Sequence, residues 1–261
     1  MTESAHNRNI RVSGDVEGSQ VVAGDRNIVV SDNATVTIHQ MSPAQPSIEP
    51  ICFGVPYQRN PYFTGRKSIL VSLHHQLSEQ NTATLNQVQA ISGLGGLGKT
   101  QTAVEYAYRY HYDQPTYDYV FWVKSDTEAN LLTGFAELAT QLSLPAIKWT
   151  EEEKKLAVKR WLATHSQWLL IFDNADMPDW LVDYLPTNPN GKVLITSRAS
   201  VFDQLGIETP LALSVLSSDE SVELLLRRTK VEKTAANIAA ATELNQALDG
   251  LPLALEQASA F

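Results

Sequence analysis

The sequence predicts an α/β fold in which a parallel five-stranded sheet is flanked by helices and followed by a small helical segment. Short, almost continuous apolar runs alternate along the chain with stretches of helical periodicity, as expected for parallel strands that are covered on both faces. In addition, a glycine-rich loop of the pattern G-x-x-x-x-G-K-T follows the first apolar run and precedes a helical stretch. The order of strand, loop and helix is the context in which this pattern binds phosphate.

The first 42 residues differ from the rest of the chain and are expected to be a β-prone or disordered segment. Val12-Ser13-Gly14-Asp15 is echoed ten residues later by Val22-Ala23-Gly24-Asp25. Short strands with Gly-Asp turns suggest stacked β-arcs, but too few units are present to bury a core alone. The segment is therefore either a disordered tail or a set of strands that pair with copies on other chains. Residues 43–60 are proline-rich at first and are expected to be a linker.

The expected helices and strands follow the apolar pattern from Pro61 onward. Leu70, Leu73 and Leu77 share one face of a first helix. Five apolar runs are expected to be strands, at residues 88–91, 119–123, 168–172, 192–196 and 211–215. Further helices are expected at residues 101–112, 131–142, 151–165, 219–229, 235–248 and from Pro252 onward.

The glycine-rich loop predicts a site for the phosphates of a nucleotide. Its glycines let consecutive backbone N–H groups point inward at phosphate oxygens, and the following helix adds a partial positive charge. Lys99 is expected to reach the β- and γ-phosphates, and the Thr100 hydroxyl to hold Mg²⁺. The residues expected to contact the nucleotide here are Gly93, Gly95, Gly96, Gly98, Lys99, Thr100 and Gln101.

Asp173, Asn174 and Arg198 complete the expected catalytic set with Lys99. Asp173 follows the third apolar run, and its carboxylate is expected to hold the Mg²⁺ shell, although Asp173-Asn174 could also be a simple turn. Arg198, after the fourth run, could read the γ-phosphate or be a solvated strand-end arginine. The Asn174 amide can orient water but cannot accept its proton, so the protein is expected to be at most a slow ATPase.

These motifs resemble the NB-ARC family, STAND-class P-loop NTPases that include apoptotic ATPases, plant disease-resistance proteins and bacterial NLR-like proteins. The chain looks closest to the bacterial branch. The resemblance rests on the order and spacing of the segments Phe63–Arg66, Gly93–Thr100, Leu169–Asp176, Val193–Arg198 and Gly250–Leu255.

The resemblance implies ADP or ATP with Mg²⁺ as ligands and the strand order 2-3-1-4-5. It implies that residues 61–216 form the nucleotide-binding domain and that residues 217–261 begin a helical subdomain. Because the last helix reaches Phe261 without a cap, the chain is expected to continue. The family pattern often has an aspartate where this chain has Asn174. The residues that the resemblance places around adenine are Phe63, Thr64, Arg66, Pro252 and Leu253.

Residues 9–38 are similar, more weakly, to amyloid-type signalling motifs at the start of some bacterial and fungal members of this class. Gln20-Val21-Val22-Ala23-Gly24 is similar to the Gln-Val-x-Gly core of such motifs, with one inserted residue. The resemblance implies self-assembly through this segment, or pairing with an effector that carries a matching motif.

Charge and composition argue against several classes of binding partner. The net charge of −9 and the pI near 5.1 argue against a nucleic-acid surface. No apolar run is long enough to span a bilayer, and a cytoplasmic location is expected. Cys52 is the only cysteine, and the adjacent His74 and His75 would not face one metal ion on a helix.

Two hypotheses remain for the function. The first is a signalling switch that binds ADP or ATP and forms homo-oligomers on nucleotide exchange, in immune or cell-death type signalling. The alternative is a work-producing P-loop ATPase of the motor or remodelling type. A motor would need a catalytic acid near Asp173, and usually a basic track for its polymer.

Overall fold

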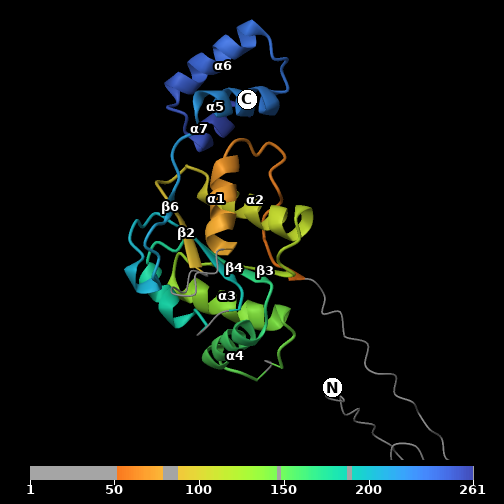
Figure 1. Ribbon diagram of the computed structural model, residues 1–261, viewed down its shortest axis with the longest axis vertical. Helices are drawn as coiled ribbons and strands as arrows, with labels where there is room; N and C mark the ends of the chain where they lie inside the picture. The colour runs from red at the N-terminus through yellow and green to blue at the C-terminus, as the bar shows by residue number, and fades with distance from the viewer. Residues whose placement is uncertain (1–51, 79–87, 146–147, 187–189, 261) are drawn as a thin grey trace, which may run out of the picture. The chain divides into compact units, whose positions relative to one another are not determined.

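The computed structural model describes residues 52–78, 88–145, 148–186 and 190–260, all within one compact unit, Ile51–Phe261 (Figure 1). The predictions for residues 1–42 lie outside the described residues. Within the described part, no helix has the length and apolar character needed to cross a membrane.

A six-stranded parallel sheet forms the centre of this unit, in the order β1-β3-β4-β5-β2-β6. The prediction of an α/β fold with a parallel sheet is therefore confirmed. Every neighbouring pair is parallel, so the carboxyl ends of all strands meet at one edge. The strands are β1 (Cys52–Phe53), β2 (Val88–Ser92), β3 (Tyr119–Lys124), β4 (Trp168–Asp173), β5 (Lys192–Ser197) and β6 (Leu211–Ala212).

The expected strand order is corrected in the centre of the sheet. In terms of the five expected strands the order is 2-3-4-1-5 and not 2-3-1-4-5, because β5 lies between β4 and β2. Leu194 of β5 pairs with Ile171 on one side and Gln89 on the other. β5 is buried from Val193 to Ser197, which suits a strand with a neighbour on each side. Spacing along the chain does not determine which gap in a sheet a strand enters.

β1 is an additional edge strand within the range expected to be a linker. Cys52 and Phe53 pair with the start of β3. Further along, Arg59 forms ion pairs with Glu105 and Asp113. Residues from Cys52 onward therefore pack against the sheet and the helix that follows the glycine-rich loop.

Helices cover both faces of the sheet (Figure 1). Alternate residues of β3 explain how: Phe121 and Val123 pack in the core under α3 and α4, whereas Val120 and Trp122 pack in the core under α1 and α2. Leu70, Leu73 and Leu77 are the buried residues of α1, as the periodicity predicts. The four helices are α1 (Lys67–Ser78), α2 (Lys99–Tyr108, continued by a π-helical turn at Arg109–Asp113), α3 (Glu128–Gln141) and α4 (Glu151–Thr164).

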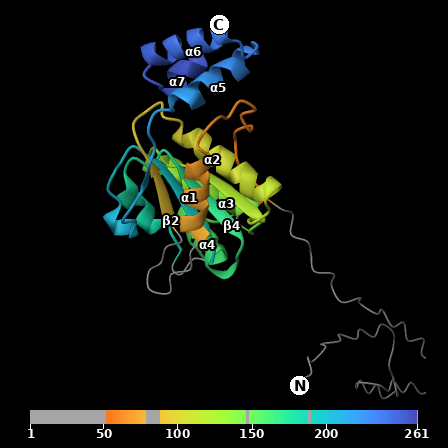
Figure 2. The ribbon, with the colours of Figure 1, turned by 45° about the horizontal axis from the view of Figure 1, so that its top comes forward.

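Three further helices, α5 (Ser218–Thr229), α6 (Ala235–Ala247) and α7 (Pro252–Ala258), form a helical subdomain (Figure 2). Leu224, Leu225 and Leu255 belong to its small apolar core. Ser217 and Glu220 form a capping box that begins α5. Two short 3-10 helices, η2 (Pro178–Asp183) and η3 (Asp203–Leu205), follow β4 and β5.

Candidate functional site

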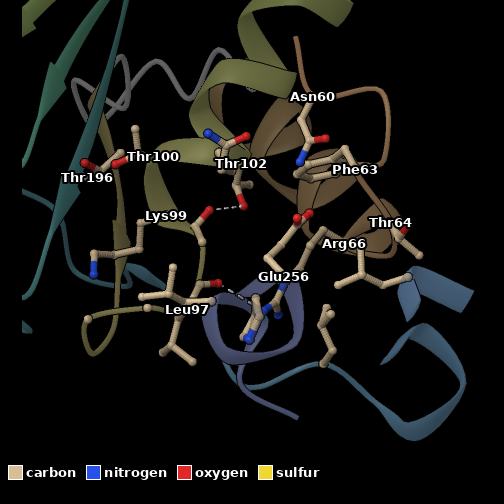
Figure 3. Close-up of a pocket in the computed structure, with 18 of the residues that line it drawn as sticks. Asn60, Phe63, Thr64, Arg66, Leu97, Lys99, Thr100, Thr102, Thr196 and Glu256 are labelled. Carbon is tan, nitrogen blue, oxygen red and sulfur yellow. Dashed lines mark hydrogen bonds between the residues drawn. The ribbon is translucent and has the colours of Figure 1, made fainter. Parts of the chain in front are cut away.

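A cavity of about 520 Å³ lies where the carboxyl edge of the sheet meets the helical subdomain (Figure 3). Its volume is within the range of small-molecule sites. Four parts of the chain line it: the segment before α1, the glycine-rich loop with the start of α2, the tips of β4 and β5, and the helical subdomain. The lining residues are Asn60, Tyr62, Phe63, Thr64, Arg66, Gly95 to Thr102, Asn174, Thr196, Arg198, Leu216, Leu224, Pro252, Leu253 and Glu256.

The glycine-rich loop connects β2 to α2 and leaves its backbone open to the cavity. Gly96 and Gly98 adopt positive φ values of 80° and 86°, which favour glycine. A Cβ placed on Gly95 or Gly98 would meet nothing within 4 Å. The first N–H groups of α2, which have no partner within the helix, lie next to this open backbone. The loop therefore offers N–H donors and the positive end of a helix dipole to an anion.

Lys99 places a positive charge at this loop. Its Nζ donates hydrogen bonds to the carbonyl oxygens of Gly93, at 2.7 Å, and Leu94, at 2.9 Å. Burial lowers the pKa of Lys99, while the nearby Asp176 opposes that shift. The ammonium group thus binds the carbonyls of the loop and lies at the cavity wall, within the part that would surround a phosphate.

Thr100 and Asp173 meet at the same end of the cavity. The Thr100 hydroxyl donates to Asp173 Oδ1 at 2.8 Å, and the Thr196 hydroxyl donates to the same oxygen at 2.6 Å. A carboxylate and a hydroxyl are ligands that suit Mg²⁺, which also keeps water and phosphate oxygens in its shell. Among the described residues no cluster of three or more His, Cys, Asp or Glu side chains forms a separate metal site. These residues fit an ion shared with a bound phosphate.

Asn174 turns the chain sharply after β4. Its φ of 65° is left-handed, a conformation that asparagine tolerates better than most residues. Its backbone N–H donates to Thr196 Oγ1 at 2.9 Å, and its exposed side chain lines the cavity. The residue is therefore both a turn and part of the cavity wall.

Arg198 lies just beyond the tip of β5 and is paired with Asp176. Its Nε donates to Asp176 Oδ2 at 2.6 Å. The hydrogen bond with Asp176 raises the pKa of Arg198, which is a cation at all relevant pH values. Because its side chain is 64% exposed, the guanidinium is accessible from the cavity that it lines.

The opposite end of the cavity is formed by Phe63, Thr64 and Arg66 (Figure 3). The Arg66 guanidinium donates to the carbonyl oxygens of Leu97, at 3.2 Å, and Ser214, at 2.5 Å. The guanidinium is thus already bound by backbone carbonyls, and it links the glycine-rich loop to the chain before α5. The Thr64 hydroxyl likewise donates to the Tyr62 carbonyl at 2.7 Å.

The start of α7 closes the cavity against the loop. Pro252 stands at the first turn of α7, where its missing N–H costs no helical hydrogen bond. The next residue, Leu253, donates its N–H to the Gly96 carbonyl at 3.2 Å. The helical subdomain therefore contacts the glycine-rich loop directly.

The cavity brings together most of the residues that the sequence singled out. Of the expected nucleotide contacts, Gly93 is outside the lining and contributes its carbonyl to Lys99. Asp173 lies behind the lining residues Thr100 and Thr196. The expected residues that line the cavity are Phe63, Thr64, Arg66, Gly95, Gly96, Gly98, Lys99, Thr100, Gln101, Asn174, Arg198, Pro252 and Leu253.

Sequence reasoning missed several lining residues, among them Asn60, Tyr62, Thr196 and Glu256. Asn60 precedes a proline in a turn, and its Oδ1 accepts the Tyr62 N–H at 2.9 Å. The Asn-Pro pair was a signal that could have drawn attention to it. Glu256 is three residues after Leu253 on α7, so helical spacing could have placed it on the same face.

Comparisons with known proteins identify the family of this chain. The NB-ARC domain model matches residues 66–235. An NLR-like protein of Hyaloscypha variabilis is 32% identical over 80% of this chain and 23% of its own length. The regulatory protein AfsR of Streptomyces griseus is 30% identical over 76% of this chain and 20% of its own length. The disease resistance protein RPS5 of Arabidopsis thaliana is 25% identical over 77% of this chain and 23% of its own length.

The chain thus spans about a quarter or less of these relatives. Among solved structures, a STAND protein with a tetratricopeptide repeat sensor from Pyrococcus horikoshii aligns with a TM-score of 0.51 and 22% identity, over 81% of this chain and 31% of its own. A Cdc6 protein from Pyrobaculum aerophilum aligns with a TM-score of 0.53 and 16% identity, over 78% and 62% of the two chains. These two show the fold. The family match covers more than half of the chain, and the chain therefore belongs to the NB-ARC family.

Proposed function

We propose that this chain is the nucleotide switch of a STAND signalling protein and binds ADP or ATP with Mg²⁺ in the cavity. The observation that carries the proposal is the convergence of Lys99, Arg198 and the Thr100–Asp173 pair on one end of a cavity of nucleotide size. A bound Mg²⁺ would neutralise charge on the phosphates. Thr100 and Asp173 would hold it, while Lys99 would turn from the loop carbonyls toward phosphate oxygens.

The base would lie at the other end, between Phe63 and the start of α7. Phe63, Thr64, Pro252 and Leu253 give this end an apolar wall with few polar groups, as in most ligand pockets. Arg66 would act indirectly, because its guanidinium holds the loop and the Ser214 carbonyl in place.

Switching requires that ADP and ATP bind two conformations with different affinities. Arg198 is the group whose contact would depend on the γ-phosphate, because it lines the cavity at the phosphate end and is exposed. The hydrogen bond from Leu253 to Gly96 would carry the change from the loop to the helical subdomain. ATP would thus act as a signal more than as a source of work.

The wider role is part of the same proposal. The relatives described as NLR-like and disease resistance proteins support a role in immune or cell-death type signalling. Such a switch would work in the cytoplasm and form homo-oligomers on nucleotide exchange. Residues 1–42 would then be brought together for self-assembly or for pairing with an effector.

The work-producing ATPase is the weaker candidate. Asn174 follows Asp173 where a motor would need an acid, and the net charge of −9 does not suit a nucleic-acid track. Turnover measurements separate the two, since many ATP molecules hydrolysed per second would contradict the switch.

Replacing Lys99 with alanine is the direct test. We expect Lys99→Ala to lose bound nucleotide on purification and to give no measurable heat with ADP or ATP, because the loop loses its cation. Lys154→Ala, a lysine-to-alanine change in α4 on the opposite face of the sheet, is the matched control and should bind as the wild type does. ADP still bound to purified Lys99→Ala, or a wild-type protein that binds neither nucleotide, would contradict the proposal.

A further inference from the structure

We propose that Asp176 sets the preference of this site for a nucleoside diphosphate over a triphosphate, by competing with the γ-phosphate for Arg198. The inference rests on the proposed nucleotide site and adds a residue that determines which phosphorylation state is favoured.

Asp176 binds Arg198 through both of its carboxylate oxygens. Oδ2 accepts hydrogen bonds from Arg198 Nε, at 2.6 Å, and Oδ1 accepts the Arg198 backbone N–H at 2.7 Å. The Nη2 atom of Arg198 lies 2.5 Å from Oδ2. The guanidinium thus places two nitrogen atoms on one carboxylate oxygen, and charge-assisted hydrogen bonds of this kind are among the stronger ones that side chains make.

Hydrogen bonds between the chain after β4 and the tip of β5 determine where this pair lies. After Asn174 turns the chain, the Ala175 N–H donates to the Thr196 carbonyl at 2.9 Å, and the fully buried Ala175 side chain anchors the segment. The Ser197 hydroxyl donates to the Ala175 carbonyl at 2.7 Å. These bonds fix the chain after β4 to the tip of β5, so that Asp176 comes to lie beside Arg198.

The pair lies beside the phosphate end of the cavity. Arg198 lines the cavity with its side chain 64% exposed, whereas Asp176 lies outside the lining and is 23% exposed. Asp176 and Arg198 act with opposite signs on the pKa of Lys99, so all three charges occupy one region. Burial raises the pKa of Asp176, but hydrogen bonds from Arg198 outweigh it and leave the pKa below its usual range. Asp176 is therefore a negative charge at neutral pH.

A γ-phosphate arriving at Arg198 would find the guanidinium already bound by a carboxylate. Either Arg198 releases Asp176, which loses its hydrogen bonds, or the phosphate approaches with a negative charge close by. Both outcomes weaken binding of a triphosphate. A diphosphate has no γ-phosphate and leaves the pair intact, so Asp176 would shift the affinity ratio toward ADP.

The test is Asp176→Asn, which keeps an oxygen for the Arg198 backbone N–H and removes the charge. ADP and the non-hydrolysable AMP-PNP are titrated, with Mg²⁺, into wild type and variant by calorimetry. We expect the ratio of the AMP-PNP to the ADP affinity to rise by about fivefold, at the low end of couplings between sites. The gain should shrink at high ionic strength, because it is electrostatic. Asp179→Asn, an exposed acid three residues further along, is the matched control and should leave the ratio unchanged.

Arg198→Gln provides a second measurement that does not depend on how well Asp176→Asn folds. It should weaken AMP-PNP more than ADP, and the double variant with Asp176→Asn should bind AMP-PNP more tightly than Arg198→Gln alone, because the unpaired carboxylate is gone. An unchanged affinity ratio in Asp176→Asn, in a wild type that binds both nucleotides, would overturn the inference and leave the proposed function standing. A wild type that binds neither nucleotide would remove the proposed function and the inference with it.

Discussion

Gly250 and Gly206 adopt nearly the same left-handed backbone conformation in different surroundings. Their φ values are 65° and 68°. A Cβ on Gly250 would lie 2.6 Å from the Leu216 carbonyl oxygen, while a Cβ on Gly206 would meet nothing within 4 Å. Leu216 lines the cavity and donates its N–H to the Gly250 carbonyl at 2.9 Å. Gly250 is therefore required both for its backbone conformation and for the close approach of two chain segments.

This pair of glycines gives a residue-scale prediction. Gly206→Ala should reduce the free energy of unfolding by about 1 kcal/mol, the cost of a left-handed alanine. Gly250→Ala should cost about 2 kcal/mol more, because backbone must also move, and should weaken ADP binding. Chemical denaturation of both variants measures the difference. Equal losses of stability in the two variants would show that the contact with Leu216 has no energetic importance.

At the same scale, the sequence located the residues whose roles depend on local motif geometry. Lys99 and Thr100 follow the glycines of one continuous loop, so their placement needed no knowledge of the sheet. Thr196 and Asp176 were missed as site residues because their contacts join the ends of β4 and β5. Those contacts exist only because the two strands are neighbours, and this was hidden by the incorrect strand order.

Among the elements, α3 shows how closely a helix can approach the sheet when it carries a glycine. A Cβ on Gly134 would lie 2.8 Å from a methyl group of Val123 on β3. Both residues are buried in the core between this face of the sheet and its helices. Replacing Gly134 would therefore force α3 away from β3, although glycine is itself a poor helix former.

We expect Gly134→Ala to destabilise the fold by about 1 to 2 kcal/mol. Overpacking of a core costs up to about 3 kcal/mol, and the better helix propensity of alanine returns about 1 kcal/mol. Thr133→Ala, one residue earlier and exposed, is the matched control and should change stability by less than about 0.5 kcal/mol. Urea denaturation compares the two. A Gly134→Ala variant more stable than wild type would mean that the helix moves without cost.

The lengths of the elements were predicted best where the periodic signal is long. The expected helix at residues 151–165 corresponds to α4, which begins at a Thr150 capping box. In contrast, β6 is only Leu211–Ala212: Leu213 still donates its N–H to the Ser92 carbonyl of β2, but the carbonyl of the next residue, Ser214, accepts from Arg66. β1, of two residues, is too short to produce any alternation in the sequence.

At the scale of the whole described unit, the sheet and the helical subdomain meet around the cavity through a few specific bonds. Leu253 donates to the Gly96 carbonyl, and the Arg66 backbone N–H donates to Glu220 Oε1 of α5 at 3.1 Å. Arg227 of α5 donates to the Pro61 carbonyl at 2.9 Å. A nucleotide in the cavity would touch both sides of this junction and should stabilise it.

We therefore predict that bound ADP protects the helical subdomain, as well as the glycine-rich loop, from hydrogen exchange. At saturating ADP with Mg²⁺, hydrogen exchange should slow in peptides from α7, because fluctuations that open the junction become rarer. Peptides from α4, which packs on the opposite face of the sheet, should change little. Protection confined to residues 93–100 would contradict this coupling.

Because β5 lies next to β4 in the sheet, the end of β5 contacts both acidic groups at and after the end of β4. Thr196 is bound to the carboxylate beside the expected metal, and Arg198, two residues later, is bound to the second carboxylate. Thr196 belongs to β5 and Arg198 lies just beyond its end, so one short stretch of chain binds both Asp173 and Asp176. Inserting or deleting one residue between them would therefore shift the arginine relative to Asp176 while Thr196 kept its place beside Asp173, however well the rest of the protein folded.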